Sequence, residues 1–362
     1  MFLTFIKVIF FIKCIIYRLF SNNFIVKRMK GIIKRSYENP NSLSDDDILQ
    51  LLSIDCFGND FYELISASNK LTRKSFNNRA YVFMQIGLNA EPCSGGCKFC
   101  SFGDNNFSVE NRWHKTKNEI IEAVQSAVKE GVDDIFLMTT ADYSFDEYIS
   151  VVEAVKPLLK EDMRLVANIG DFSISDAQKL KNIGITGVYH VNRLREGVDT
   201  AIDPELRAKT LDIIRDADLE LYYCIEPIGK EHSYEEILVE IRRAQHLCPD
   251  VMAVMRRVGV ENTPMWDRES VTAIELTKIA AVTNLIVRPK RAMNLHETEQ
   301  MSLLAGINQL YAECGSNPRD NDCETEKNRG LSVCRAKELF RDSGYICKKY
   351  IYTYETLCMA KS

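Results

Sequence analysis

Three cysteines lie close together in the sequence, with the spacing of ligands to an iron-sulfur cluster. They occur in Cys93-Ser-Gly-Gly-Cys97-Lys-Phe-Cys100, directly after an apolar run at residues 81–88 that is typical of a strand. Three thiolates on a four-iron cluster leave one iron without a protein ligand, and such an open iron can bind a small molecule. Zinc sites and ferredoxin clusters with four cysteines are closed. The spacing therefore predicts a [4Fe-4S] cluster with one open position, held by Cys93, Cys97 and Cys100.

The residues between these cysteines suit the same role. Gly95 and Gly96 allow the backbone to curl so that three sulfurs converge, and Phe99 places an aromatic ring beside the last cysteine. The motif Cys-x3-Cys-x2-Cys resembles the signature of the radical S-adenosylmethionine (SAM) enzymes. The resemblance implies that the open iron binds SAM, and that one electron from the cluster cleaves SAM to methionine and a 5'-deoxyadenosyl radical. A three-sulfur zinc site and reduced thiols without a ligand are the alternatives.

The composition is that of an ordinary globular protein and limits the other function classes. The chain has 362 residues, of which 46% are hydrophobic and 27% charged, enough for one large barrel or two ordinary domains. Its net charge of -5 disfavours a general nucleic-acid surface. Its 12 cysteines are not the dense framework of a small secreted domain, and an open cluster needs reducing conditions. We therefore predict a cytoplasmic protein without disulfides that does not bind nucleic acid.

Residues 1–28 form a hydrophobic and basic segment that differs from the rest of the chain. Lys7, Lys13 and Arg18 interrupt its apolar run, which makes a poor membrane-spanning helix, and no small-residue cleavage site follows. Three interpretations compete: a start assigned too early, with Met29 as the true start; an amphipathic helix on a membrane surface; and a signal anchor. We favour the first, and expect membrane contact only if this segment belongs to the protein.

From residue 79 onward, strand and helix patterns alternate. Apolar runs typical of strands occur at Tyr81–Leu88, Asp134–Met138, Arg164–Ile169, Gly187–Val191, Glu220–Ile225, Val251–Val258, Ile286–Met293 and Asn308–Ala312. Helical patterns fall between them, at Lys117–Lys129, Asp146–Leu159, Asp176–Asn182, Pro204–Ala217, Tyr234–Leu247 and Val271–Asn284. The alternation predicts an α/β protein with a TIM-type (β/α)8 barrel, the fold that the radical SAM resemblance also implies. An open six-stranded barrel is the alternative.

We expect three further segments around the barrel, which itself spans residues 79–312. After residues 1–28, a helical N-terminal extension covers residues 29–78, where Ser44 and the acidic residues that follow it form a helix start. A short appendage at residues 313–362 contains a cysteine-bearing loop and a helix. Reactive groups of such barrels lie at the C-terminal ends of the strands, so the cysteine loop after the first strand belongs at the barrel mouth.

Beyond the cysteines, the chain resembles the biotin synthase-like branch of the radical SAM family, which includes biotin synthase, the hydrogenase maturase HydE and methylornithine synthase. The resemblance extends over about residues 81–312. It rests on three segments, at residues 187–196 with the helical pattern after them, residues 223–229, and residues 287–294 continuing to residues 304–311.

The first of these segments implies contacts with SAM. A guanidinium group binds a carboxylate in a bidentate manner, so Arg193 or Arg195 is expected to pair with the SAM carboxylate. Glu196 is expected to accept a hydrogen bond from the amine or the ribose, and Asn192 can both donate and accept. The alternative for each of these residues is a surface ion pair or a cap at a strand end.

Three more residues complete the expected SAM site. Asn168 ends the third strand and can both donate and accept hydrogen bonds. Thr139 belongs to Met138-Thr-Thr-Ala-Asp142, which stands where many relatives have a Gly-Gly-Glu-like turn that holds the methionyl amine. The match there is weak, so Thr139 is expected to act through its hydroxyl and backbone. Phe99 is expected beside the cofactor.

The cysteines outside the motif bear on the reaction. Biotin synthase carries a second, [2Fe-2S] cluster as its sulfur source, with cysteines on strands two, three and five. The expected strands two and three contain no cysteine here, and only Cys224 lies near the third position, which argues against biotin synthase itself. A second cluster past the last strand would suit sulfur insertion of the lipoyl synthase kind, but ordinary thiols are the favoured interpretation of its candidate ligands, Cys314, Cys323 and Cys334.

The sequence thus predicts a radical SAM enzyme of cofactor biosynthesis that performs sulfur insertion similar to that of biotin synthase or lipoyl synthase. A HydE-like or methylornithine synthase-like reaction without sulfur insertion is the alternative, and a non-catalytic iron-sulfur scaffold is the alternative outside enzymes. The expected partners are a small-molecule substrate and a reducing electron donor such as ferredoxin or flavodoxin.

Overall fold

Eight parallel strands close into a barrel in the computed structural model, which describes residues 28–107, 109, 112–296, 300–314 and 331–348. The strands follow the order β1-β10-β9-β8-β7-β6-β5-β4 around the barrel, and β4 pairs with β1 to close it. Their bounds are β1 Tyr81–Gly87, β4 Asp134–Met138, β5 Arg164–Asn168, β6 Gly187–Tyr189, β7 Glu220–Ile228, β8 Val251–Arg256, β9 Ala292–His296 and β10 Gln309–Cys314. The predicted (β/α)8 class is confirmed, and the open six-stranded alternative is wrong.

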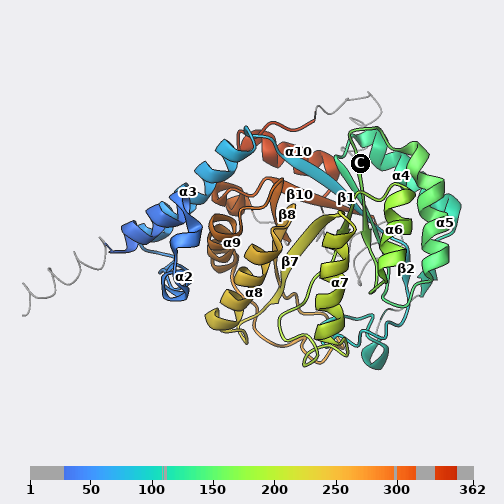
Figure 1. The fold of residues 1–362 in the computed structure, drawn as a ribbon, viewed down its shortest axis with the longest axis horizontal. Coiled ribbons are helices and arrows are strands. Elements are labelled where there is room, and N and C mark those ends of the chain that lie inside the picture. Colours follow the sequence, from blue (N-terminus) through green and yellow to red (C-terminus); the bar gives the residue numbers. More distant parts are fainter. Residues whose placement is uncertain (1–27, 108, 110–111, 297–299, 315–330, 349–362) are drawn as a thin grey trace, which may run out of the picture.

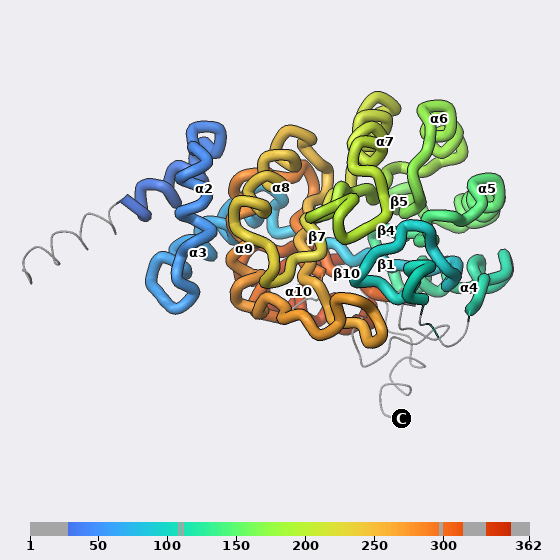
Figure 2. Tube along the Cα trace, turned by 90° about the horizontal axis from the view of Figure 1, so that it is seen from below, coloured from blue at the N-terminus to red at the C-terminus, as the bar shows by residue number. Residues whose placement is uncertain are grey.

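Helices cover the outside of this barrel (Figures 1 and 2). They are α4 Lys117–Glu130, α5 Phe145–Val155, α6 Ile174–Asn182, α7 Pro204–Asp216, α8 Tyr234–Leu247, α9 Ala273–Val287 and α10 Val333–Asp342. A side-chain oxygen caps the start of each helix and contributes about 1 kcal/mol. The capping residues are Thr116, Ser144, Ser173, Asp203, Ser233, Thr272 and Ser332. The caps fix the points at which the loops from the strand ends enter the helices.

The predicted seventh strand exists, but its predicted bounds, Ile286–Met293, are wrong. Residues up to Val287 belong to α9, and the strand is β9, Ala292–His296. The bounds were wrong because α9 is buried on all sides: every residue from Leu276 to Val287 is buried, and its last turn is apolar like a buried strand. Arg288 ends the helix in the left-handed conformation, with φ 53°, before the chain turns into β9.

Two N-terminal helices explain why α9 is buried all round. They are α2 Asp45–Leu52 and α3 Asn59–Ser75, and α3 lies along α9. The Asn284 side chain on α9 donates to Ser68 Oγ (2.8 Å) and Thr72 Oγ1 (2.9 Å) on α3. The predicted helix start at Ser44 is confirmed, because its side chain and that of Asp47 form a capping box. Residues 28–38 are also helical, and the division into domains stays a prediction.

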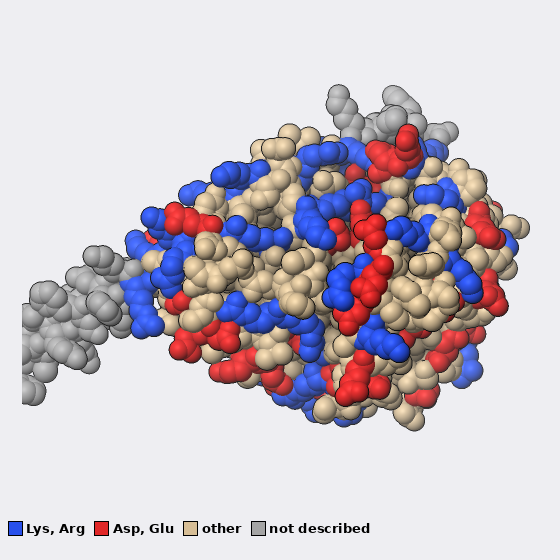
Figure 3. Space-filling view, viewed as in Figure 1, with Lys and Arg blue, Asp and Glu red and all other residues tan. Residues whose placement is uncertain are grey.

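The remaining described elements are short. Strands β2 Asn89–Ala90 and β3 Trp113–His114 pair antiparallel beside the barrel mouth. Four 3₁₀ turns occur at η1 Pro40–Ser42, η2 Asp104–Asn106, η3 Lys156–Leu158 and η4 Gln300–Ala305. In the part of the chain that the structure describes, no helix combines the length and the apolar character needed to span a bilayer. Acidic and basic side chains are intermingled on the face shown in Figure 3.

Large side chains fill the lower half of the barrel interior. This plug consists of Phe83, Phe136, Val166, Tyr222, Val251, Ala292 and Tyr311. Successive side chains of a strand point to opposite faces, so the interior residues two positions further along each strand lie above the plug, toward the C-terminal ends. The plug therefore closes the barrel from below and leaves its mouth as the place for a site.

Below the plug lies a buried ion pair that links distant strands. The guanidinium of Arg291, just before β9, donates to both carboxylate oxygens of Asp134 at the start of β4, at 2.6 and 2.7 Å. Asp134 is fully buried, and Arg291 is 9% exposed. We predict that Arg291→Ala lowers the free energy of unfolding by about 3–5 kcal/mol, because Asp134 is left as an uncompensated buried charge.

Urea unfolding of the purified protein measures this cost. The control is Lys34→Ala, which removes an exposed pair with Glu38 at 3.8 Å and should change the unfolding free energy by less than about 1 kcal/mol. A cost for Arg291→Ala as small as that of the control would show that the pair does not stabilise the barrel.

Candidate active site

The cysteine loop leaves β1 and folds back on itself at the barrel mouth. The Cys93 N–H donates to Phe102 O (2.7 Å), and the Asp104 N–H donates to Cys93 O (3.0 Å). Gly96 has φ +53°, and a Cβ at this position would lie 3.0 Å from Ala201 Cβ. A side chain there would oppose both the backbone conformation and the close approach of the next loop. The glycine is therefore required for the curl that the sequence predicted.

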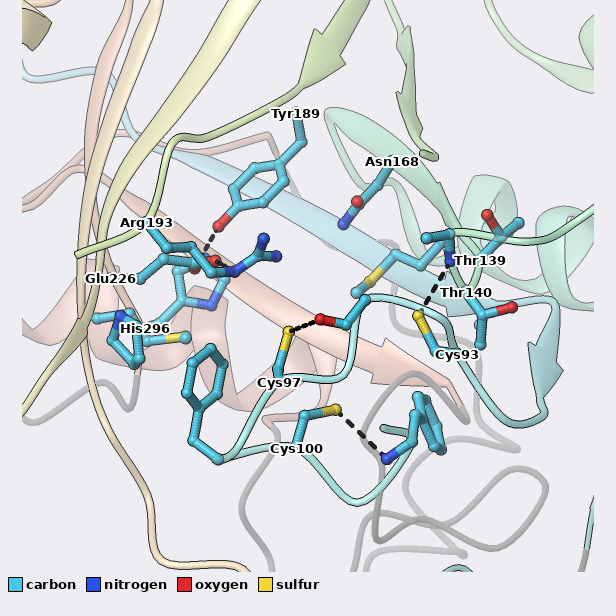
Figure 4. A pocket seen from close by; sticks show the side chains of 18 of the residues that line it. Cys93, Cys97, Cys100, Thr139, Thr140, Asn168, Tyr189, Arg193, Glu226 and His296 are labelled. Carbon is cyan, nitrogen blue, oxygen red and sulfur yellow. Dashed lines mark hydrogen bonds and ion pairs between the residues drawn. The ribbon is translucent and has the colours of Figure 1, made fainter. Parts of the chain in front are cut away.

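The loop forms one side of a cavity of about 280 Å³ at the C-terminal ends of the strands, lined by all three cysteines (Figure 4). Each strand of the barrel contributes at least one side chain to this cavity, and one from each strand is Gln85, Met138, Asn168, Tyr189, Glu226, Met255, His296 and Glu313. Six of these eight side chains can form hydrogen bonds, and the other two are methionines. The cavity thus has a polar floor above the apolar plug.

The three sulfurs have different surroundings. The Ala141 N–H donates to Cys93 Sγ (3.4 Å) and the Phe102 N–H to Cys100 Sγ (3.5 Å), whereas Cys97 Sγ lies 3.7 Å from Gly95 O. Burial raises the pKa of Cys97 to about 12 and that of Cys100 to about 11. These thiols would hold their protons at neutral pH in the protein alone, and bound metal supplies the positive charge that makes thiolates stable.

Four arginines line the same cavity: Arg193, Arg207, Arg256 and Arg257. Arg193 Nε lies 3.1 Å from Glu226 Oε1, and the other oxygen of Glu226 accepts a hydrogen bond from Tyr189 (2.6 Å). Burial opposes the charge of Arg193, but Glu226, Cys97 and Glu196 outweigh it, so the pKa of Arg193 is raised.

The second arginine, Arg207, is 6% exposed and lies in the first turns of α7. Its Nη1 lies 3.5 Å from Asp171 Oδ1 and 3.3 Å from the ring nitrogens of His190. Arg193 Nη1, Arg207 Nε and Thr139 Oγ1 are buried atoms without a hydrogen-bond partner among the described residues. Since buried polar groups are nearly always paired, these atoms indicate a missing ligand with acceptor oxygens.

The structure divides the predicted SAM contacts into two groups. Phe99, Thr139, Asn168 and Arg193 line the cavity together with the cysteines. Asn192, Arg195 and Glu196 do not line it, and their side chains contact other parts of the protein.

The side chains of these three residues hold the loop between β6 and α7. The Asn192 side chain donates to Pro204 O (3.0 Å), and Arg195 Nε donates to Glu236 Oε1 (2.8 Å) on α8. Glu196 accepts from the backbone N–H of Arg193 (2.9 Å) and from the hydroxyl of Thr200 (2.6 Å). The arrangement fixes the backbone from which Arg193 reaches the cavity.

Sequence reasoning did not single out several cavity residues, among them Tyr189, Glu226 and Arg207. A signal existed for Glu226, because it follows Tyr222 and Cys224 at alternate positions of one strand and so shares their inward face. No such signal exists for Arg207, since only the packing of α7 turns it toward the strand ends.

The proposed second cluster lies mostly outside the described residues. Cys323 and the side chain of Cys314 are not among them. Cys334 lies on α10, where its Sγ is 3.8 Å from Glu338, and it does not line the cavity. Cys224 is fully buried in the barrel, close enough to Tyr189 and Glu226 for side-chain hydrogen bonds.

The described residues fit an iron-sulfur cluster with a bound anionic ligand. Three thiols open into one cavity, two amides donate to their sulfurs, and Arg193 and Arg207, each with a buried nitrogen that lacks a hydrogen-bond partner among the described residues, line the same cavity. Three thiols from one loop are a donor set that suits a multi-iron cluster.

The buried group formed by His190, Asp171 and Arg207 should make the stability of the protein depend on pH. Burial lowers the pKa of His190 to about 4. The charge of Arg207 also lowers this pKa, whereas Asp171 raises it. Burial favours a raised pKa for Asp171, but His190 and Arg207 outweigh it and lower that pKa to about 2. Unfolded histidine titrates near 6.5, so the unfolded state binds more protons than the native state between pH 6.5 and 4. The free energy of unfolding therefore decreases as the pH falls through this range, because the native state holds His190 neutral.

We predict that between about pH 7 and pH 5 the wild type loses about 2 kcal/mol more unfolding free energy than His190→Gln. Urea unfolding at the two pH values measures the difference, in which the titration of other groups cancels. Asp171 stays ionised throughout this range. Equal losses in the two proteins would show that His190 is not held neutral.

Comparisons with known proteins relate the chain to biotin synthases. No protein-family model matches the chain. It is 24% identical to the biotin synthase of Clostridioides difficile (strain 630) over 275 residues, which cover 73% of this chain and 82% of that protein. It is 25% identical to the biotin synthase of Ehrlichia canis (strain Jake) over 309 residues, covering 78% of this chain and 91% of that one.

Solved structures support the fold. The chain superposes on methylornithine synthase (PylB) with a TM-score of 0.75 at 19% identity, covering 88% of this chain and 97% of that one. It superposes on the FeFe-hydrogenase maturase HydG from Carboxydothermus hydrogenoformans with a TM-score of 0.74 at 17% identity, covering 92% and 82%. The cysteine motif, the closed barrel and the similarity to biotin synthases over most of the chain together support an enzyme of the radical SAM class that is similar to the biotin synthase-like branch.

Proposed function

We propose that this enzyme cleaves SAM reductively at a [4Fe-4S] cluster held by Cys93, Cys97 and Cys100. When bound, the cluster and SAM would supply a 5'-deoxyadenosyl radical that abstracts a hydrogen atom from the substrate. The observation that carries the proposal is the convergence, in one cavity, of three thiols from a single loop with unpartnered guanidinium atoms from two arginines. A carboxylate beside an open iron is the ligand that such a donor set suits.

The cavity residues divide the binding work for SAM. Arg193 and Arg207 would pair with the carboxylate, since both line the cavity and each has a buried nitrogen without a hydrogen-bond partner among the described residues. Thr139 and Asn168 would contact the amine or the ribose through a hydroxyl and a carboxamide. Phe99 would cover the cofactor beside the cluster loop. In this proposal Asn192, Arg195 and Glu196 support the site by holding the loop that carries Arg193.

The polar side chains of the cavity floor favour a small polar substrate. A radical must be kept from water and from the protein until it meets one C–H bond. The plug closes the barrel below the floor, and Gln85, Tyr189, Glu226 and His296 can hold a substrate through hydrogen bonds. A substrate with several hydrogen-bonding groups fits this floor better than an alkyl chain does.

The reaction beyond SAM cleavage has two candidates. Sulfur insertion in cofactor biosynthesis needs a second cluster as the sulfur source, which would have to use cysteines past the barrel. Among the described strand residues whose side chains face the interior, Cys224 is the only cysteine. The second candidate is a rearrangement or maturation reaction without sulfur insertion, which needs no second cluster. In either case we propose a cytoplasmic setting and a ferredoxin or flavodoxin as the electron donor, because the open cluster must be kept reduced.

Iron analysis tests the proposal directly. We predict about four irons and four sulfides per chain after anaerobic reconstitution, because three cysteines suit one [4Fe-4S] cluster. The triple variant Cys93→Ala, Cys97→Ala, Cys100→Ala should lose them. The EPR signal of the reduced wild type should change when SAM is added, and 5'-deoxyadenosine should form.

The outcomes separate the alternatives. Iron that survives in the triple variant and is lost when Cys314, Cys323 and Cys334 become serine would favour sulfur insertion. A cluster without 5'-deoxyadenosine would favour a scaffold protein. No iron in the wild type would overturn the proposed function.

Substitution of the arginines tests the SAM site. We predict that Arg207→Ala weakens SAM binding to the cluster-loaded enzyme by about 10- to 100-fold, because a charged hydrogen-bond pair contributes about 1.5–3 kcal/mol. Titration of SAM against the EPR change measures the affinity. The matched control is Arg215→Ala, on the same helix but with an exposed ion pair to Asp212. Arg195→Ala tests the expectation from the sequence that Arg195 binds the SAM carboxylate. A loss of SAM affinity as large as that of Arg207→Ala would contradict the assignment of Arg207 to the SAM carboxylate.

A further inference from the structure

The loop after β4 contacts the cysteine loop on both sides of Cys93. On one side, the Thr140 N–H donates to Asn89 Oδ1 (3.0 Å) and Asn89 Nδ2 donates to Thr140 Oγ1 (2.9 Å). On the other, the Asp142 carboxylate accepts from the backbone N–H of Ser94 (2.6 Å) and from its hydroxyl (2.5 Å). Two side-chain contacts thus hold residues 139–142 against the residues that flank the first cysteine.

Between these two contacts lies the amide of Ala141, which donates to Cys93 Sγ (3.4 Å). The peptide that follows this amide is also packed closely. A Cβ on Gly170, in the loop after β5, would lie 2.5 Å from Ala141 O, so only a glycine admits that carbonyl. Asn89 and Asp142 thus hold the two residues on either side of the Ala141 N–H, and Gly170 leaves room for the next carbonyl.

This amide differs in origin from the other amide that points at a cluster cysteine. The Phe102 N–H that donates to Cys100 Sγ belongs to the cysteine loop itself. The Ala141 N–H comes from the loop after a different strand, so its distance from the sulfur depends on what holds the two loops together. Hydrogen bonds to cysteine sulfurs are one of the terms that set the potential of an iron-sulfur cluster. An N–H dipole stabilises the negative charge added on reduction, and so raises the potential.

We propose that Asp142 is a positioning residue that, through Ser94, holds the Ala141 amide on Cys93 Sγ and thereby raises the reduction potential of the cluster. The inference rests on the proposed function, since it assumes that Cys93 ligates a cluster. Its chemical consequence is that the cluster accepts its electron from the donor more readily.

The negative charge of Asp142 acts in the opposite direction to the hydrogen bond that it supports. A carboxylate near the cluster disfavours reduction, so its removal alone would raise the potential. Asp142→Asn and Asp142→Ala both remove the charge, but asparagine keeps an acceptor oxygen for Ser94 and alanine does not. The difference between these two variants therefore isolates the positioning effect. Asp146→Asn removes an exposed charge four residues further on, and reports the effect of charge alone.

The test is an EPR-monitored redox titration of the four anaerobically reconstituted proteins, with iron and sulfide determined for each. We expect Asp142→Ala to have a lower potential than Asp142→Asn, by a three- to tenfold change in the reduction equilibrium, or about 30–60 mV for one electron. Asp142→Asn should behave like Asp146→Asn. Loss of iron in Asp142→Ala alone would also support the positioning role, because it would show that the contact holds Cys93 in place for the cluster.

Equal potentials for Asp142→Ala and Asp142→Asn, both with full iron, would overturn this inference and leave the proposed function intact. Absence of iron from the wild type would overturn both.

Discussion

All eight strands of the barrel run in the same direction, and this constraint brings the site together. Each strand ends at the same rim, so at least one side chain per strand reaches a common cavity although Gln85 and Glu313, from the first and last strands, are far apart in the sequence. The closure of β1 against β10 and β4 sets the width of that cavity. The plug below it and the capped helices around it keep the rim in place.

Burial of charge is the main energetic problem that this arrangement has to solve. Arg193 and Arg207 are kept in the cavity wall by carboxylates on neighbouring elements, Glu226 and Asp171, which offset the cost of removing guanidinium groups from water. The residues that bind these partners, Tyr189 and His190, are neutral. The wall therefore presents oriented N–H groups toward the cavity while its own charges remain paired.

The cysteine loop is held by its neighbours as much as by its own turns. Its internal backbone bonds make the curl, but contacts from the loops after β4 and β6 decide how it sits on the barrel. Lys98, between two of the cysteines, donates through its side chain to Val198 O (2.7 Å), and Ser94 binds Asp142 on the opposite side. A ligand set that is continuous in sequence is in this way fixed relative to the strand ends, where the substrate would lie.

The local sequence by itself determined the three-cysteine motif, the helix start at Ser44 and the alternation of strands and helices, because each depends on residues a few positions apart. It did not determine where α9 ends, since α3 covers a helix whose last turn resembles a strand in composition. Nor did it separate Arg193, which faces the cavity, from Arg195, which pairs with Glu236. Only the tertiary structure decided these points, because side-chain direction at a strand end depends on the neighbouring loops that pack against it.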